Sequence, residues 1–203
     1  MSFSHTFHNH TVMAVLRNQT VEDTVRLTHI ALDLGITLIE VPIQTPDAVP
    51  ALEAAIAAAK ERGAGCGAGT VTTIDQVDLC ARLGASFTVA PGLDEAVVER
   101  SRQVALPHLP GVATASEIQA AIALGCQWVK AFPAALLTPA WFHAMTTGPF
   151  PLVNFIASGG ISANNADEFL AAGAAAVAVG SALEDPSQLE KLSQLIAART
   201  THS

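Results

Sequence analysis

Short, almost wholly apolar runs alternate along the chain with longer stretches in which apolar and polar residues are mixed. Parallel β-strands that are covered on both faces have this near-continuous apolar character. The pattern therefore predicts eight buried strands, at residues 12–16, 38–43, 65–71, 87–90, 106–110, 128–132, 153–157 and 176–179.

The intervening stretches carry Ala, Leu, Glu and Arg at helical spacing and predict helices, for example over residues 21–34, 48–62, 74–83, 95–102, 115–124 and 166–172. Hydroxyl residues that can cap a first turn precede four of these helices, namely Thr20, Thr73, Thr114 and Ser162. Glycines follow the last helical residue of five of them, where a left-handed backbone favours glycine, at Gly35, Gly63, Gly84, Gly125 and Gly173.

Eight strand–helix units in a chain of 203 residues predict an α/β protein that forms a single-domain (β/α)8 barrel, or TIM barrel, over residues 1–203. Residues 1–10 are expected to form a flexible polar N-terminus. An open, doubly wound sheet is the alternative fold. The barrel is favoured because no Gly-x-Gly-x-x-Gly sequence follows the first strand.

The hydrophobic content and the net charge indicate which kinds of molecule the protein can bind. Hydrophobic residues make up 50% of the chain and charged residues 14%, which indicates that another subunit covers part of an apolar surface. A net charge of −8 without a run of Lys or Arg argues against nucleic acid or an anionic membrane as partner. A small anionic substrate remains compatible with that charge.

The cysteines and the N-terminal sequence bear on the cellular compartment. Cys66, Cys80 and Cys126 are odd in number and lack C-x-x-C spacing, so we expect buried, reduced thiols in a cytoplasmic protein. No apolar signal-peptide region opens the chain, and no apolar stretch is long enough to span a bilayer.

Active-site groups of such barrels sit at the C-terminal ends of the strands and in the loops that follow. Twelve residues occupy these positions: Arg17, Glu40, Gln44, Thr70, Pro91, Gly92, Lys130, Ser158, Gly159, Gly160, Gly180 and Ser181.

Lys130 is the most informative of them, because it lies inside an apolar run, whereas Lys60 and Lys191 lie in polar helical segments. Burial disfavours an ammonium group and lowers the pKa of a lysine, which yields a neutral amine that can attack a ketone. Glu40 is the acidic residue inside a predicted strand, and it is a candidate general acid and base for such chemistry. A purely structural ion pair between the two residues is the alternative.

Two glycine-containing loops are candidate anion sites. Gly159 and Gly160 follow the seventh strand and Gly180 and Ser181 follow the eighth, where many barrels bind phosphate through backbone N–H groups. Simple turn glycines are the alternative at both places. Arg17 ends the first strand, where its guanidinium could pair with a carboxylate in bidentate fashion or form a salt bridge at the rim.

Nine short motifs follow one another in an order that is similar to a known family: AVLR (14–17), IEVP (39–42), GAGTV (67–71), PGL (91–93), PGV (110–112), KAFP (130–133), GPF (148–150), SGGI (158–161) and VGSAL (179–183). Together they resemble the 2-keto-3-deoxy-6-phosphogluconate (KDPG) aldolases and their 4-hydroxy-2-oxoglutarate (KHG) aldolase relatives. The resemblance covers roughly residues 12 to 185.

This resemblance implies a class I, metal-independent aldolase without a cofactor, which is usually a homotrimer. The implied reaction cleaves a phosphorylated 2-keto-3-deoxy acid to pyruvate and glyceraldehyde 3-phosphate, and cleavage of 4-hydroxy-2-oxoglutarate to pyruvate and glyoxylate is the alternative. A metal-dependent aldolase needs His and carboxylate ligands at strand ends, where the sequence offers only Glu40. A phosphate-binding barrel without turnover is the non-enzymatic hypothesis.

By the same resemblance, Lys130 is the Schiff-base lysine and Glu40 shuttles protons. The implied substrate contacts are Gly69 and Thr70 at the pyruvate end, Phe132 beside the pyruvyl group, and Gly159, Gly160 and Ser181 at the phosphate.

Three positions bear on substrate choice. Many gluconate-type members carry arginine four residues after the glutamate, where this chain has Gln44. Arg17 matches a subset that includes the 6-phosphogalactonate enzymes, so the carboxylate clamp is expected on the first strand. Ser158 replaces the usual threonine and keeps the hydroxyl group.

Overall fold

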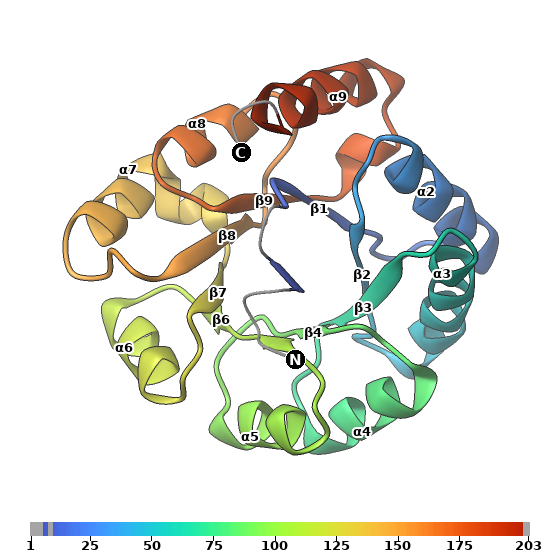
Figure 1. Ribbon diagram of the computed structural model, residues 1–203, viewed down its shortest axis with the longest axis horizontal. Helices are drawn as coiled ribbons and strands as arrows, with labels where there is room; N and C mark the ends of the chain where they lie inside the picture. The colour runs from blue at the N-terminus through green and yellow to red at the C-terminus, as the bar shows by residue number, and fades with distance from the viewer. Residues whose placement is uncertain (1–5, 8–9, 201–203) are drawn as a thin grey trace.

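The protein is a closed barrel of parallel strands surrounded by helices, seen along the barrel in Figure 1. The computed structural model describes residues 6–7 and 10–200. Every strand pairing in the sheet is parallel. The strands are β1 (Val12–Val15), β2 (Leu38–Pro42), β3 (Gly65–Gly69), β4 (Thr88–Val89), β5 (His108–Leu109), β6 (Gly111–Val112), β7 (Trp128–Ala131), β8 (Asn154–Ser158) and β9 (Ala176–Val179).

The barrel closes through one divided strand. The sheet order is β5-β4-β3-β2-β1-β9-β8-β7-β6, so its two ends, β5 and β6, are consecutive pieces of the chain. Pro110 separates them and has no N–H to donate, although its carbonyl accepts a 2.8 Å hydrogen bond from the N–H of Lys130. The predicted fifth strand therefore exists as two short pieces, of which β5 pairs with β4 and β6 with β7.

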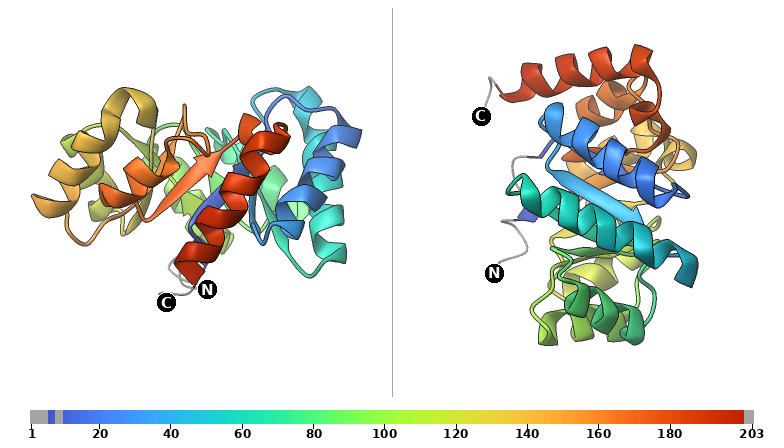
Figure 2. Two further views of the ribbon diagram at one scale, coloured as in Figure 1. Left: turned by 90° about the horizontal axis from the view of Figure 1, so that it is seen from above. Right: turned by 90° about the vertical axis from the view of Figure 1, so that its right-hand side faces the viewer.

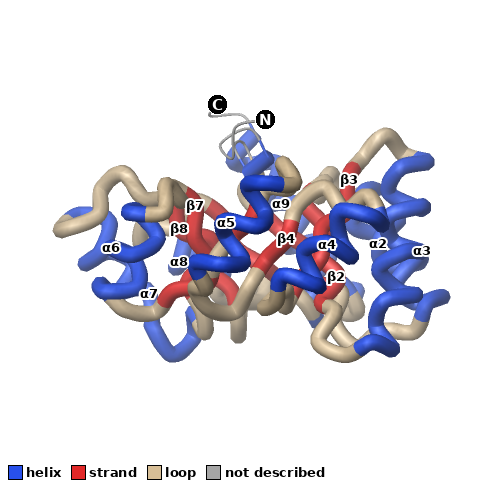
Figure 3. The backbone as a smooth tube through the Cα atoms, turned by 90° about the horizontal axis from the view of Figure 1, so that it is seen from below, coloured by secondary structure: helices blue, strands red, loops and turns tan. Residues whose placement is uncertain are grey.

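Helices form the outer layer, and Figures 1 and 2 show them following one another around the strands. Figure 3 shows the same arrangement from the side, with strands inside and helices outside. The α-helices are α2 (Val21–Asp33), α3 (Val49–Glu61), α4 (Ile74–Leu83), α5 (Glu95–Gln103), α6 (Ala115–Ala123), α7 (Ala134–Thr147), α8 (Ala166–Ala171) and α9 (Pro186–Thr200), and the short 3-10 helices are η1 (Pro46–Ala48) and η2 (Ser181–Leu183).

Most predicted helix ends are confirmed. The hydroxyls of Thr20, Thr73 and Thr114 accept hydrogen bonds from first-turn N–H groups, and Thr114 forms a full capping box with Glu117. The five terminal glycines all have positive φ. Ser162 is the exception: α8 begins at Ala166, as its predicted range has it, but the Ser162 hydroxyl accepts a hydrogen bond from Asn164 in the turn before the helix and does not cap the helix itself.

Two hydrophobic clusters divide the molecule. One lies between the strands and the helices, and the other fills the barrel itself. Phe7 belongs to the inner cluster: it is fully buried, and its ring packs edge-on against Phe87 and beside Trp128. The expectation of a flexible polar segment over residues 1–10 is therefore wrong at Phe7, while residues 1–5 and 8–9 lie outside the described part. This aromatic group closes the N-terminal end of the barrel.

The three cysteines are free and buried, as expected. Burial raises the pKa of the Cys66 thiol to about 12, and the neighbouring Glu40 carboxylate adds to the rise. Burial also raises the pKa of Cys80 to about 12. Both thiols therefore stay protonated at neutral pH. Within residues 6–7 and 10–200, no helix is long and apolar enough to cross a membrane.

His108 is a fully buried histidine in β5. Its Nδ1 lies 2.8 Å from the Thr88 hydroxyl, and its Nε2 has no hydrogen-bond partner in the described structure. Burial lowers the pKa of His108 from 6.5 to about 4, against a smaller opposing effect of Asp94. The folded protein therefore holds this ring in its neutral form.

The lowered pKa of His108 predicts a pH dependence of stability. The unfolded chain takes up a proton near pH 6.5 and the folded chain near pH 4, so this contribution is complete above pH 6.5 and falls as the pH drops toward 4. Over that window it amounts to about 3 kcal/mol. We expect His108→Asn to flatten this part of the curve of unfolding free energy against pH. The exposed His143→Asn control should keep the wild-type slope; equal slopes for wild type and His108→Asn would contradict the prediction.

Candidate active site

Lys130 and Glu40 meet inside the barrel. Lys130 Nζ lies 3.7 Å from Glu40 Oε1, and their side chains are 3% and 0% exposed. The separation is that of an ion pair and is too long for a strong hydrogen bond. Both Glu40 oxygens lack a hydrogen-bond partner among the described residues. Because burying an ion costs several kcal/mol, a pair with this much unused bonding capacity is typical of a site that receives another polar group.

The glycines of β3 make room for this carboxylate. Glu40 is opposite Gly67 in the sheet, and a side chain at Gly69 would occupy the position of the Glu40 carboxylate. A side chain at Gly67 would instead collide with the Phe87 ring. The inward face of β3 therefore has no side chains, and the space it leaves holds Glu40 near the barrel mouth and Phe87 deeper inside.

The residues after β7 bring the lysine close to the first glycine loop. The Phe132 ring centre is 5.3 Å from Lys130 Nζ, and the ring lies where a side chain at Gly159 would be. Ala135 blocks the corresponding position at Gly160, and its N–H donates a 3.0 Å hydrogen bond to the Gly159 carbonyl. Gly159 and Gly160 have φ of 93° and 77°, conformations that favour glycine.

Thr70 follows β3 and has a left-handed backbone with φ of 58°. A β-branched residue rarely adopts this conformation, which costs about 1–2 kcal/mol. Such strain is concentrated at functional sites, where the surrounding structure enforces it. Thr70 is therefore held at the strand exit beside Gly69, which is the position expected from the sequence.

Pro91 lies against the strand that pairs with the lysine. A side chain at Gly111 would collide with the Pro91 carbonyl group, and Gly111 is opposite Lys130 in the sheet. The N–H of Gly111 also donates a 3.0 Å hydrogen bond to the Gly92 carbonyl. The loop after β4 thus closes over the break between β5 and β6, next to Lys130.

The last two strands end side by side. Ser158, which is 5% exposed, is opposite Ala178, and Gly180 and Ser181 follow β9 directly. A side chain at Gly180 would touch the carbonyl of Val15 at the end of β1. The two glycine-containing loops and the end of β1 therefore adjoin one another at the barrel mouth.

Arg17 and Gln44 lie at the exposed rim of the mouth. The Arg17 guanidinium has no ion pair or hydrogen bond with any residue that the structure describes. The Gln44 amide, in contrast, donates a 2.5 Å hydrogen bond to Asn18 Oδ1. Sequence reasoning did not single out Asn18, and only its place beside Arg17 hinted at a role.

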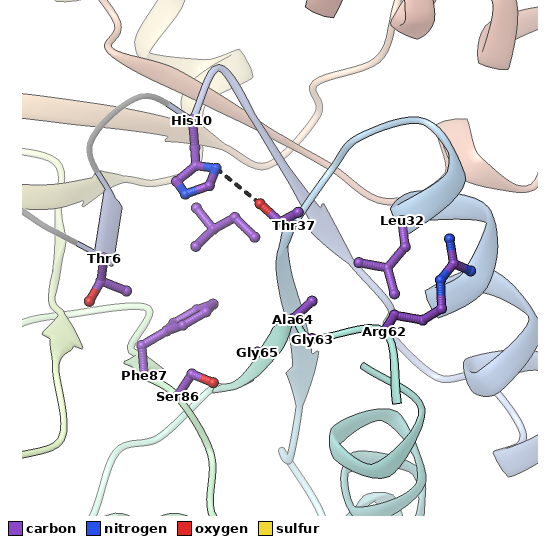
Figure 4. Close-up of a pocket in the computed structure, with 11 residues that line it drawn as sticks. Thr6, His10, Leu32, Thr37, Arg62, Gly63, Ala64, Gly65, Ser86 and Phe87 are labelled. Carbon is purple, nitrogen blue, oxygen red and sulfur yellow. Dashed lines mark hydrogen bonds between the residues drawn. The ribbon is translucent and has the colours of Figure 1, made fainter. Parts of the chain in front are cut away.

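A separate cavity of about 440 Å³ lies at the opposite end of the strands. Figure 4 shows it between Thr6, His10, Thr37, Ser86 and Phe87, near the starts of β2, β3 and β4. His10 and Thr37 approach each other at 3.4 Å on its wall. In barrels of this kind that end serves stability, and the C-terminal end carries the chemistry.

The chain is similar to known proteins along most of its length. The sequence family described as "KDPG and KHG aldolase" matches residues 4–197. The 2-dehydro-3-deoxy-phosphogluconate aldolase of Treponema pallidum is 36% identical over 162 residues, which are 79% of this chain and 75% of that one. The 2-dehydro-3-deoxy-6-phosphogalactonate aldolase of Escherichia coli is 30% identical over 188 residues, 92% and 91% of the two chains.

The chain is also similar to solved structures of aldolases of this kind. The KDPG aldolase of Legionella pneumophila, captured with pyruvate as a covalent carbinolamine intermediate, is 29% identical and has a TM-score of 0.82, with 98% of each chain covered. The thiamine phosphate pyrophosphorylase of Pyrococcus furiosus, at 18% identity and a TM-score of 0.75, shares the fold.

The fold and the groups at the barrel mouth define the class of protein. It is a single-domain TIM barrel with a buried lysine–carboxylate pair near the C-terminal ends of its strands. The comparisons then give the family. The chain belongs to the KDPG and KHG aldolase family and is an aldolase, that is, a carbon–carbon lyase.

The contact between Gly69 and Glu40 generates a mutational prediction. A methyl group at residue 69 would displace the Glu40 carboxylate, and displacement of a catalytic group by about 1 Å costs on the order of 100-fold in rate. We expect Gly69→Ala to lower kcat for aldol cleavage about 100-fold. Gly67→Ala is the matched control. Its methyl group meets the Phe87 ring, so it should lower the melting temperature and reduce kcat much less than Gly69→Ala does. Equal kcat losses in both variants would show that general strain, not Glu40, is responsible.

Proposed function

We propose that the protein is a class I aldolase that cleaves a 2-keto-3-deoxy-6-phospho sugar acid to pyruvate and glyceraldehyde 3-phosphate through a Schiff base on Lys130. The observation that carries the proposal is the 3.7 Å approach of Lys130 to Glu40, both buried, while neither carboxylate oxygen accepts a hydrogen bond from a described residue. The covalent pyruvate carbinolamine captured in the Legionella relative supports the same chemistry.

The buried pair supplies a reactive amine. Transfer of one proton from the Lys130 ammonium to Glu40 removes two opposite charges from a dry site and leaves a neutral amine beside a neutral acid. The amine attacks C2 of the substrate, and Glu40 gives its proton to the departing hydroxyl as water is lost. The product is an iminium, which accepts electrons from the C3–C4 bond.

Cleavage and release use the same carboxylate. The C4 hydroxyl loses its proton to Glu40 through a water molecule, the C3–C4 bond breaks, and the aldehyde leaves. The electron pair of the broken C3–C4 bond stays on the C3 side and forms the enamine of pyruvate on Lys130. Glu40 returns the proton to C3, and water hydrolyses the resulting imine to free pyruvate. One carboxylate can serve every proton transfer, because neither of its oxygens accepts a hydrogen bond from another described group.

The remaining candidates are proposed to bind the two ends of the substrate. Gly69, Thr70 and Arg17 bind the carboxylate end, and Phe132 and Pro91 flank the pyruvyl group. Ser158 and the N–H groups of the two glycine loops bind the phosphate. This last set comprises Gly159, Gly160, Gly180 and Ser181.

Gln44 stands where many gluconate-type members carry arginine, and the relatives include enzymes named for both sugar acids, at 36% identity over 162 residues and 30% over 188. The ratio of kcat/KM for the gluconate-derived and galactonate-derived substrates, with 4-hydroxy-2-oxoglutarate as the third compound, decides between the alternatives.

Trapping tests the Schiff base directly. We expect sodium borohydride with pyruvate, in the presence of EDTA, to abolish activity and to leave one covalent adduct on Lys130, because hydride reduces the imine to a stable amine. Peptide mass mapping identifies the site. Lys130→Met should give no adduct, whereas the exposed Lys60→Arg should be labelled like the wild type. An adduct on Lys60, or none at all, contradicts the assignment.

We also propose that the protein is a homotrimer. Leu136 and Leu152 are 81% and 85% exposed, which is unusual for leucine. Leu152 borders an apolar groove of about 330 Å³ with Ile122, Pro149 and Phe150. Few charged residues and an exposed apolar groove are typical of a surface that a second subunit covers.

The groove generates the assembly prediction. A carboxylate at residue 152 would be buried without a partner in the interface, which costs several kcal/mol. Light scattering at micromolar concentration should therefore report a trimer for the wild type and a monomer for Leu152→Glu. Ile74→Glu, on α4 and 44% exposed in the wild type, is the control and should remain trimeric. A monomeric wild type would remove the proposal.

A further inference from the structure

The loop after β1 is fastened to both neighbouring loops of the barrel mouth. On one side, Gln44 Nε2 donates a 2.5 Å hydrogen bond to Asn18 Oδ1, which connects the loop to the exit of the Glu40 strand. On the other side, Gln19 Nε2 donates to Glu184 Oε1 at 3.0 Å, which connects it to the segment after β9. Side chains thus brace this loop from two directions.

Arg17 lies between fixed neighbours. The N–H of Leu16 donates a 2.9 Å hydrogen bond to the Glu40 carbonyl, so the residue before Arg17 is still part of the sheet. Asn18 on the other side has a left-handed backbone with φ of 57°, which asparagine tolerates better than most residues. The main chain of Arg17 is therefore held from both sides while its side chain is exposed.

The distribution of positive charge indicates what the braced loop presents to a substrate. Among the basic side chains that the structure describes, Arg17, Lys60, Arg82 and Lys191 have no ion pair. Lys191 instead donates a 2.6 Å hydrogen bond to Asn164 Oδ1, in the loop after β8. Lys60 and Arg82 lie in the last turns of α3 and α4, at the N-terminal end of the barrel. Arg17 is therefore the cation at the mouth whose charged group has neither an ion pair nor a hydrogen bond with the described residues, in a protein whose net charge of −8 otherwise repels an anionic substrate.

We propose that Asn18 and Gln44 are positioning residues that hold the Arg17 guanidinium for the carboxylate of the substrate. Gln44 acts through Asn18 and does not itself contact the substrate. The inference rests on the proposed function. It favours the carboxylate over the phosphate because the Gln44 hydrogen bond joins the loop to the Glu40 strand, next to the reacting carbon. A guanidinium held in one orientation can bind a carboxylate in bidentate fashion with less loss of conformational entropy.

Two substitutions remove only the amide–amide hydrogen bond. Asn18→Gly keeps a residue that accepts positive φ, and Gln44→Met keeps the chain length. Each should raise KM for the phosphorylated 2-keto-3-deoxy acid about fivefold and leave kcat within about twofold, and the double variant should equal either single one. In an Arg17→Gln background, neither should have a further effect. Gln103→Met, on the outer face of α5, is the matched control and should keep the wild-type KM.

Calorimetric titration with pyruvate and with inorganic phosphate needs no turnover and decides the inference independently. The dissociation constant for pyruvate should rise about fivefold in Asn18→Gly and Gln44→Met, and that for phosphate should not change. The inference is overturned by unchanged KM and pyruvate affinity, by an equal effect in the Arg17→Gln background, or by an effect on phosphate alone. Failure to label Lys130 with borohydride overturns the proposed function instead, and the calorimetric result then still applies to the loop.

Discussion

The buried contact between Lys130 and Glu40 is the constraint to which much of the barrel interior is adapted. An ammonium and a carboxylate taken out of water cost several kcal/mol each, and their attraction offsets this only in part when both carboxylate oxygens lack hydrogen bonds. The side-chain-free inner face of β3 makes the contact sterically possible. The apolar core must then supply the stability that the pair does not, which is consistent with a chain that is half hydrophobic.

The fold was largely predictable because each signal in the sequence was local. Apolar runs marked the strands, and capping hydroxyls and terminal glycines marked most helices. The errors arose where a tertiary contact overrides a local rule. No bounds were predicted for helix α7, in which Thr138 leaves the helical conformation before Pro139 and divides the helix into two pieces. Phe7 lay in a polar segment, and only the closed barrel reveals the aromatic site between Phe87 and Trp128 that it occupies.

The site was predictable to the extent that one residue contradicted its surroundings. A charged residue inside an apolar strand is costly, so Lys130 and Glu40 stood out, and the strand-end rule of barrels placed them together. The hydrogen bond between Gln44 and Asn18 gave no such signal, because it joins two polar loops whose distance only the folded chain sets. Gly69 was expected at the pyruvate end through the family resemblance, but its steric relation to Glu40 depends on the register between β2 and β3.

The two ends of the barrel have different roles: the N-terminal end packs the core, and the C-terminal end holds the reactive groups. At the N-terminal end, the large aromatic rings of Phe7, Phe87 and Trp128 pack against one another. At the C-terminal end, the inner positions carry glycines and polar groups with unused hydrogen-bonding capacity, and Thr70 adds a strained backbone. The packed aromatic end can offset the stability that the mouth lacks, because both ends belong to one continuous sheet. Residues such as Phe87, which have no chemical part in the reaction, thus contribute the stability that the groups around Lys130 do not.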